Sequence, residues 1–127
     1  MTLPDPLRPS GFLIVIEPLA AGSAFEALRI VEDETEVRLA AQDALNRAKL
    51  HARFASVDTL WYSRRFTYQS AERVLDDMLA VDPKRQAVVH SRRADVVAAV
   101  RAAAEHSNGE LILEQTMRAD VMRKPQA

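Results

Sequence analysis

The sequence has no cysteine among its 127 residues. Disulfide bonds, thiolate metal sites and a cysteine nucleophile are therefore excluded. Its most apolar uninterrupted run covers residues 12–16, far short of the ~20 residues that a membrane-spanning helix needs. No basic segment precedes that run and no small-residue cleavage site follows it, so it does not resemble a secretion signal. We expect a cytoplasmic protein that makes no contact with membranes.

The sequence also has little excess charge of either sign. Its 17 Lys and Arg residues nearly balance 18 Asp and Glu residues, which gives a formal net charge of −1. Such a balance does not favour binding to nucleic acid or to an anionic membrane, and we expect neither as a partner. Hydrophobic residues make up 48% of the chain, a composition typical of a globular protein. The length fits a single domain.

Three segments have strand-like composition. Residues 12–16 form an unbroken run of branched and aromatic side chains, which is typical of a strand buried on both faces within a parallel sheet. Residues 54–68 are rich in Val, Thr and aromatic residues. Their second half is so polar that we expect it to project beyond the sheet or to form its edge. Residues 110–122 alternate between apolar and polar positions, which predicts a last strand.

Two helices are predicted between the first two strands. Ser23 and Glu26 form a capping-box pattern, in which the Glu26 carboxylate reaches back to the Ser23 amide, and this helix is expected to end at about Val31. The second helix covers residues 34–52, where apolar positions recur at helical spacing. The apolar stripe consists of Val37, Ala40, Ala41, Ala44, Leu45 and Ala48.

Two further helices are predicted before the last strand. Ser70 is expected to cap an amphipathic helix of about three turns. Asp82 followed by Pro83 is the pattern of a cap with proline at the first helical position, and it predicts a helix that runs to about His106. The Asn108–Gly109 pair is then expected to stop this helix. The order is therefore strand, two helices, strand, two helices, strand, which predicts an α/β layered sheet.

Several segments of the chain resemble a known family. Residues 7–18, which read Leu-Arg-Pro-Ser-Gly-Phe-Leu-Ile-Val-Ile-Glu-Pro, are similar to the stretch that introduces the fifth strand of class I S-adenosylmethionine-dependent methyltransferases. Ser10 stands where that family usually has glycine. Residues 26–29, 33–38 and 113–121 resemble segments of a bacterial subgroup of the same family. The resemblance extends over nearly the whole chain, and it points to the C-terminal half of the family's fold.

The resemblance implies a particular fold: an α/β, partial methyltransferase-like (Rossmann-like) sheet of three strands with four helices. The family's sheet has seven strands, of which the last is antiparallel and lies between the fifth and the sixth. Residues 12–17, 54–66 and 110–122 are accordingly expected to be the fifth, sixth and seventh strands. The expected organisation is an irregular arm over residues 1–10, one methyltransferase-like subdomain over residues 11–124 and a tail over residues 125–127.

The part of the family's fold that binds the cofactor has no counterpart in this sequence. The family uses a Gly-rich turn after its first strand, because glycine lets the backbone approach the ligand closely. The glycines present here, Gly11, Gly22 and Gly109, are too widely spaced to form such a turn. We therefore expect this chain alone to bind no cofactor. S-adenosylmethionine would be bound only if a partner supplied the missing half.

Glu17, Trp61 and Tyr62 are the candidate substrate-binding residues. Glu17 ends the first strand, where α/β sheets usually bind ligands, although we favour the alternative of a partly exposed strand-end carboxylate that caps a nearby amide. Trp61 and Tyr62 belong to a cluster of aromatic and basic residues that could stack on bases. Packing against the next helix or a dimer contact is the alternative for this cluster. No pattern predicts a metal site or identifies a catalytic residue.

A bare strand edge predicts a partner. If no strand precedes residues 12–16 in the sheet, an apolar edge remains free to associate, and we expect a homodimer through that edge. A separate cofactor-binding chain is the alternative partner. Three functions remain open: a methyltransferase-like protein, inactive alone, that acts as an oligomeric scaffold or ligand-binding module; a methyltransferase subunit completed by another chain; and a small α/β ligand-binding protein unrelated to methylation.

Overall fold

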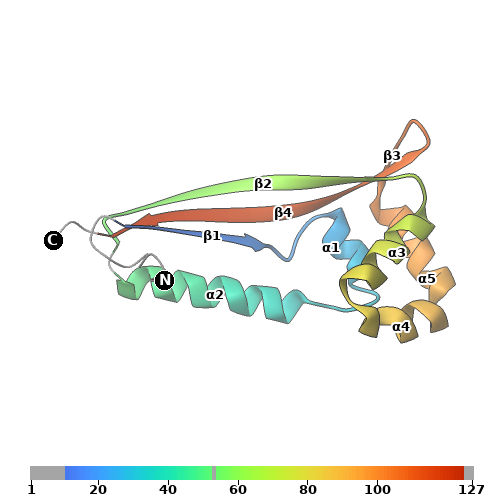
Figure 1. Ribbon diagram of the computed structural model, residues 1–127, viewed down its shortest axis with the longest axis horizontal. Helices are drawn as coiled ribbons and strands as arrows, with labels where there is room; N and C mark the ends of the chain where they lie inside the picture. The colour runs from blue at the N-terminus through green and yellow to red at the C-terminus, as the bar shows by residue number, and fades with distance from the viewer. Residues whose placement is uncertain (1–10, 53, 125–127) are drawn as a thin grey trace, which may run out of the picture.

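A computed structural model describes residues 11–52 and 54–124 of the chain (Figure 1). The predicted arm (residues 1–10) and tail (residues 125–127) lie outside the described residues, as does the first part of the methyltransferase-like motif. The fold is mixed α/β, as expected from the sequence. The elements in chain order are β1 (Phe12–Pro18), α1 (Ser23–Leu28), α2 (Thr35–Ala52), β2 (Ser56–Tyr68), α3 (Ala71–Val81), the 3₁₀ helix η1 (Pro83–Arg85), α4 (Gln86–Ser91), α5 (Arg93–Ala103), β3 (Glu105–Ser107) and β4 (Glu110–Arg123).

The strands form one open antiparallel sheet with β4 at its centre. β1 and β2 pair antiparallel with opposite edges of β4, and β3 pairs with the beginning of β4. The order β1-β4-β2 confirms that the last strand is antiparallel and lies between the other two long strands. It also makes β2 an edge strand, which confirms the interpretation of its polar second half. β1 and β2 run parallel to each other, so their carboxyl ends point the same way along the sheet.

The number of elements differs from the prediction, because the described residues form four strands and five α-helices. The helix expected from Pro83 to His106 is interrupted at Arg92, where φ −121° and ψ 28° are not helical. It then ends at Ala103, and residues 105–107 become β3. The Asn108–Gly109 pair has φ values of 51° and 76° and turns β3 into β4. Two positive φ values at Asn-Gly are typical of a tight hairpin turn, which the helix-stop interpretation missed.

The expectation that residues 12–16 are buried on both faces within a parallel sheet is wrong. β1 pairs only with the antiparallel strand β4 among the described strands. Phe12, Ile14 and Ile16 are 52%, 61% and 58% exposed, whereas Leu13 and Val15 on the other face are half-buried. An unbroken apolar run allows burial on both faces, but burial also requires a layer on each face. In the described part of the chain, no element covers the outer face of β1.

The hydrophobic core lies at one end of the sheet. Helices α1, α3, α4 and α5 gather there, at the right of Figure 1, whereas α2 runs along the half of the sheet that holds β1. Helix and strand residues both contribute to this core. It comprises Ala27, Ala71, Val74, Leu75, Val89, Val96, Val100, Leu111 and Leu113.

The buried face of β4 changes halfway along the strand. Alternate residues from Leu111 to Met117 are buried on one face, and alternate residues from Arg118 to Met122 are buried on the opposite face. The pairing of β4 with β1 and β2 is continuous, so no bulge separates the two halves. Right-handed twist over long strands turns opposite faces toward the same side. The first half of β4 thus faces the helical core, and the second half faces α2.

α2 contacts the sheet through a largely polar face and not through most of its apolar stripe. The half-buried residues of the helix are Thr35, Arg38, Gln42, Leu45, Lys49 and Ala52. Within the predicted stripe only Leu45 faces the sheet, while Val37 is 68% exposed and the alanines are exposed as well. The pattern of the stripe is amphipathic as predicted. Its apolar side, however, points away from the part of the chain that the structure describes.

The beginning of α1 also differs from the prediction. The helix starts at Ser23 after Gly22, and no side chain caps it. The Ser23 hydroxyl accepts a hydrogen bond from the Glu114 amide at 2.7 Å instead, and Glu26 pairs with Arg29 at 3.3 Å. Gly22 has φ 104°, and a Cβ atom there would clash with the Glu114 carbonyl oxygen. Close docking of α1 on β4 therefore takes the hydroxyl that the capping box would have used.

Candidate functional site

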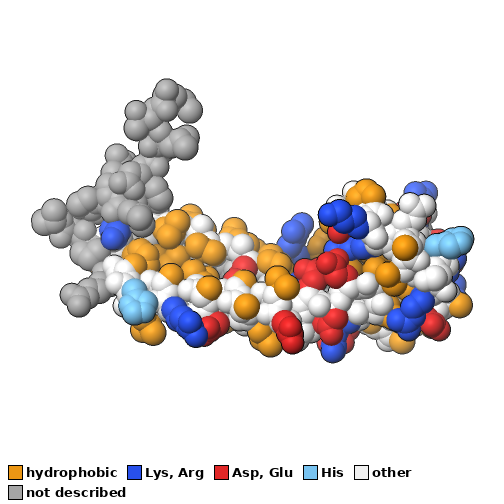
Figure 2. All heavy atoms as spheres, turned by 90° about the horizontal axis from the view of Figure 1, so that it is seen from below, with side chains coloured by type: hydrophobic (Ala, Val, Ile, Leu, Met, Phe, Trp, Pro, Cys, Tyr) orange, Lys and Arg blue, Asp and Glu red, His pale blue; other side chains and the backbone are white. Residues whose placement is uncertain are grey.

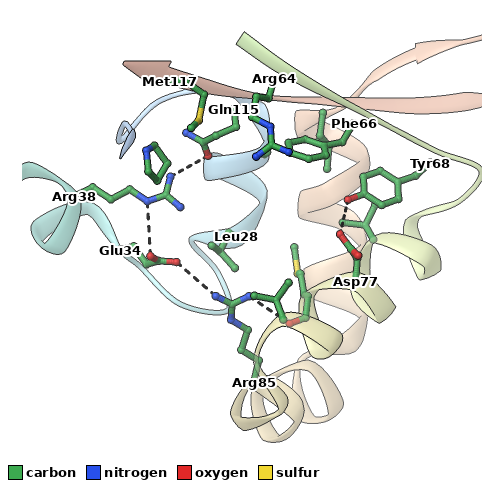
Figure 3. A pocket seen from close by; sticks show the side chains of 16 residues that line it. Leu28, Glu34, Arg38, Arg64, Phe66, Tyr68, Asp77, Arg85, Gln115 and Met117 are labelled. Carbon is green, nitrogen blue, oxygen red and sulfur yellow. Dashed lines mark hydrogen bonds and ion pairs between the residues drawn. The ribbon is translucent and has the colours of Figure 1, made fainter. Parts of the chain in front are cut away.

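A pocket of about 570 Å³ opens beside the carboxyl ends of β1 and β2 (Figure 3). Small-molecule sites usually have volumes of ~300–1,000 Å³, and α/β sheets usually bind ligands outside the carboxyl ends of their strands. Nine of the sixteen lining residues are apolar. These nine are Pro18, Ala24, Leu28, Phe66, Val74, Met78, Val81, Leu113 and Met117.

A network of ion pairs borders the pocket at the start of α2. The Glu34 carboxylate lies 3.7 Å from Arg38 and 3.6 Å from Arg85, and Arg85 also pairs with Glu32 at 3.0 Å. Arg38 donates to the Gln115 side-chain oxygen at 2.9 Å (Figure 3). Its buried Nε has no hydrogen-bond acceptor among the described residues. The network therefore holds Arg38 firmly and leaves one of its donors unsatisfied.

Three side chains of β2 line the other side of the pocket. The Tyr68 hydroxyl donates to Asp77 of α3 at 2.8 Å. Burial raises the pKa of Tyr68 to about 12, with further contributions from the hydrogen bond and the charge of Asp77, so Tyr68 stays protonated at neutral pH. The Arg64 guanidinium lies 5.2 Å from the centre of the Phe66 ring. No carboxylate in the described residues forms an ion pair with Arg64.

A second polar cluster is buried between α2 and the sheet. Asp120 is fully buried and accepts hydrogen bonds from Lys49 at 3.1 Å and from the Thr59 hydroxyl at 2.6 Å. Arg118 lies 3.3 Å from Asp120 and also pairs with Glu17. We call these five residues, Glu17, Lys49, Thr59, Arg118 and Asp120, the buried charge cluster. It joins all three long strands to α2.

The charge state of Asp120 follows from its surroundings. Burial on its own would raise the pKa of Asp120, because a carboxylate loses hydration there. Hydrogen bonds from Thr59 and Lys49, together with the charges of Lys49 and Arg118, outweigh that effect and lower the pKa below its ordinary value. Asp120 is therefore ionised: its Oδ1 accepts both hydrogen bonds, and its Oδ2 lies 3.3 Å from Arg118 Nε as an ion pair without a hydrogen bond in the described residues. This arrangement fits a structural ion cluster better than a catalytic base.

The three candidate residues from the sequence do not form one site. Glu17 and Trp61 lie opposite Arg118 on its two sides in the sheet register, so they share one face. Glu17 pairs with Arg118, and Trp61 is 62% exposed. Tyr62 points to the opposite face next to Met117 and is half-buried. Glu17 thus belongs to the buried charge cluster, and none of the three lines the pocket.

The pocket residues on β2 belong to a pattern that is visible in the sequence. Arg64, Phe66 and Tyr68 belong to the same cluster of aromatic and basic residues as Trp61 and Tyr62. Strand alternation places these three residues on one face, and the helices cover that face at this end of the sheet. Arg38, Asp77 and Arg85 had no comparable signal, because they come from separate helices.

Metal binding and membrane crossing find no support in the described residues. Across the described ranges, no group of three His, Cys, Asp or Glu residues is placed to hold a metal ion. No described helix combines the length and the apolar composition that crossing a membrane requires. Two glycines with positive φ, Gly22 and Gly109, serve the docking of α1 and the β3–β4 turn. The chain matches no protein-family model, and no curated protein is similar to it at a significant level.

Proposed function

We propose that the chain is a cytoplasmic, methyltransferase-like half-domain with a Rossmann-like origin, which does not transfer methyl groups alone and acts as a scaffold in a homodimer. The observation that carries this proposal is β1. One edge of this strand has no partner among the described strands, and three large apolar side chains on one of its faces are exposed. The strand order β1-β4-β2 supports the methyltransferase-like part of the proposal.

The backbone of β1 is arranged to accept another strand. Gly11 accepts a hydrogen bond from the Lys124 amide at 3.0 Å, and the Leu19 amide donates to Thr116 at 2.9 Å. In an antiparallel ladder, alternate residues bond to the same neighbour, so the odd-numbered residues of β1 bond to β4. The amide and carbonyl groups of the residues between them, at 12, 14 and 16, therefore point to the free edge. A second strand can pair there without disturbing β4.

The free edge of β1 is better suited to association than that of β2. Exposed charged residues interrupt β2, among them Asp58, Arg64 and Arg65. Charges on an edge strand discourage pairing with another chain. Residues 12–16 carry no charge. Figure 2 shows apolar side chains gathered over the end of the molecule where β1 and α2 lie.

A second copy of this chain fits the edge of β1 by symmetry. Two β1 strands paired antiparallel about a two-fold axis at Ile14 would place Ile14 against Ile14, and Phe12 against Ile16 of the other copy. All three residues have their amide and carbonyl groups directed outward, so each pair can exchange two hydrogen bonds. Two-fold dimers are the commonest soluble oligomers. This pairing would join the two sheets into one.

The exposed face of β1 favours a second candidate function. Pairing of two copies through their edges satisfies the backbone but leaves the side chains of Phe12, Ile14 and Ile16 without a covering layer. A partner that supplied both a strand for the edge and a helix for this face would cover them. In that case the chain is a subunit of an S-adenosylmethionine-dependent methyltransferase, and another chain contributes the half that binds the cofactor.

Sedimentation at micromolar concentration tests the homodimer. We expect twice the chain mass of 14.2 kDa for the wild type. Ile14→Pro removes an outward amide and no hydrogen bond to β4, so we expect a folded monomer. Ile14→Thr is the matched control: it shortens the same side chain, retains the amide, and should stay dimeric. Circular dichroism confirms folding of both variants. A wild-type monomer would contradict the homodimer and leave the second candidate.

Calorimetry with S-adenosylmethionine tests the part of the proposal that concerns the cofactor. We expect the isolated chain to produce no heat of binding, because it contains no Gly-rich turn of the family's type. Saturable binding by the isolated chain would contradict a methyltransferase-like half without its own cofactor site. Binding that occurs only after addition of a second chain would support the subunit.

A further inference from the structure

We propose that the pocket beside the carboxyl ends of β1 and β2 binds a small organic anion with an apolar body, and that Arg64 recognises its carboxylate. This inference goes beyond the proposed scaffold and does not depend on dimerisation. It rests on three features of the pocket: its size and apolar lining, the pairing of its charges, and the position of Arg64 over Phe66.

Among the arginines of the described lining, Arg64 alone forms no ion pair with a carboxylate. Glu34 is shared by Arg38 and Arg85, and Asp77 accepts the hydrogen bond of Tyr68. Asp77 keeps its negative charge, because the Tyr68 hydroxyl is a neutral donor. A ligand carboxylate would give Arg64 the kind of partner that Glu34 gives Arg38 and Arg85. A dianion would have to compete for arginines that already have partners.

Arg64 lies where it can bind a carboxylate. Arg64 is exposed, and its guanidinium lies 5.2 Å from the centre of the Phe66 ring, so a cation–π contact favours its position at the mouth of the pocket. A guanidinium in such a contact can still bind a carboxylate through two parallel hydrogen bonds. Figure 3 shows Arg64 beside Phe66, with Gln115 and Arg38 on the neighbouring part of the wall.

The rest of the pocket suits the apolar body of such a ligand. Phe66, Leu113 and Met117 of the sheet, with Leu28 and Met78 of the helices, provide apolar walls. Polar lining residues other than Arg64 are largely committed to each other. The amide nitrogen of Gln115, for example, donates to the carbonyl oxygens of Leu19, Ala21 and Thr116. A strongly polar ligand would therefore find few free partners here.

The test compares 3-phenylpropionate, which has an apolar ring and one carboxylate, with two matched probes. The neutral probe is 3-phenylpropanamide, and the anion without an apolar body is acetate. Each is titrated into the ¹⁵N-labelled full chain, and backbone amide shifts are recorded by NMR. We expect saturable shifts at the pocket residues for 3-phenylpropionate. The amide and acetate should each bind about tenfold more weakly, because each lacks one of the two interactions.

Two arginine variants identify the recognising residue. Arg64→Gln should weaken binding of 3-phenylpropionate at least about tenfold and leave binding of the amide unchanged. Arg65→Gln is the control: Arg65 is the next residue, lies on the opposite face of β2 and pairs with Glu105 and Glu114. It should bind like the wild type. The inference is overturned if the wild type shows no pocket shifts at millimolar probe, if the amide binds as tightly, or if both variants behave alike.

Discussion

Replacement of Asp120 by asparagine is expected to lower the free energy of unfolding by about 3–5 kcal/mol. Asp120 is fully buried, and its neighbours Lys49 and Arg118 have side chains that are only 17% and 9% exposed. Asparagine preserves the shape of the side chain but removes its charge. Lys49 would then lie between α2 and the sheet without its counterion, with only 17% of its side chain exposed to water. Loss of one member of a buried ion pair is costly for this reason.

Burial decides the size of this effect. Asp95→Asn is the matched control, because Asp95 pairs with Arg92 at 3.6 Å and the two side chains are 65% and 50% exposed. Water screens exposed pairs, so this variant should change the stability by less than about 1 kcal/mol. Urea unfolding followed by circular dichroism, at one protein concentration, measures both variants against the wild type. Equal losses for both would show that the buried charge cluster does not hold α2 to the sheet.

The dependence on pH provides a second readout of the same cluster. The pKa of Asp120 is lowered in the folded chain and returns to its ordinary value of 3.8 in the unfolded chain. Its contribution to stability is therefore complete above that value and is lost as the pH falls through the lower folded pKa. The difference between the wild type and Asp120→Asn should shrink below about pH 4. A difference that stays constant into strong acid would mean that the carboxylate charge is not its source.

The sequence correctly predicted those features that depend on interactions between residues close together in the chain. The Ser70 hydroxyl accepts from the Arg73 amide at 3.3 Å, and the Asp82 carboxylate accepts from the Lys84 amide at 3.0 Å, as their capping patterns predicted. Cap and acceptor are close in sequence, so the pattern contains the whole interaction. The alternation over residues 110–122 likewise predicted β4, because a strand fixes its side-chain directions by itself.

Predictions failed where the structure depends on a residue that is distant in the sequence. They also failed where no described element covers an apolar face. The Ser23 hydroxyl belongs to Glu114, a residue of β4, and no local pattern reveals this competition with a capping box. The apolar run of β1 was expected to be buried on both faces, yet Phe12, Ile14 and Ile16 are exposed. An apolar sequence shows that a face can be buried, but burial also requires an element that covers it. This exposed face of β1 belongs to the surface for which we propose a partner.

The residues of the candidate site could likewise be predicted only in part from the sequence. The cluster of aromatic and basic residues on β2 was recognised as unusual, and Arg64 and Phe66 do line the pocket. Trp61 and Tyr62 do not line the pocket: Trp61 lies on the opposite face of β2, and Tyr62 lies on the same face as Arg64 but outside the lining. The pairing of Glu17 with Arg118 depends on the register of β1 and β4. These residues are far apart in the sequence, and no local pattern links them.

Replacement of Leu75 by alanine is expected to lower the free energy of unfolding by about 2–5 kcal/mol. Leu75 of α3 has no exposed surface and lies in the core formed by the helices and the first half of β4. Its truncation removes packed methyl groups and leaves a cavity among valines that are themselves held by neighbouring elements. The core occupies one end of the sheet, so few other residues can compensate. Urea unfolding measures the loss.

Leu50→Ala is the matched control for this change. Leu50 of α2 is 80% exposed, so removal of the same atoms should alter the stability of the monomer by less than about 0.5 kcal/mol. The comparison has to be made at several protein concentrations, because assembly adds to apparent stability by mass action. If Leu50→Ala proved as damaging as Leu75→Ala, and more so at high concentration, α2 would be covered in the assembly. If Leu50→Ala were as damaging as Leu75→Ala at every protein concentration, Leu50 would have to be buried within the single chain. That result would contradict its exposure in this structure.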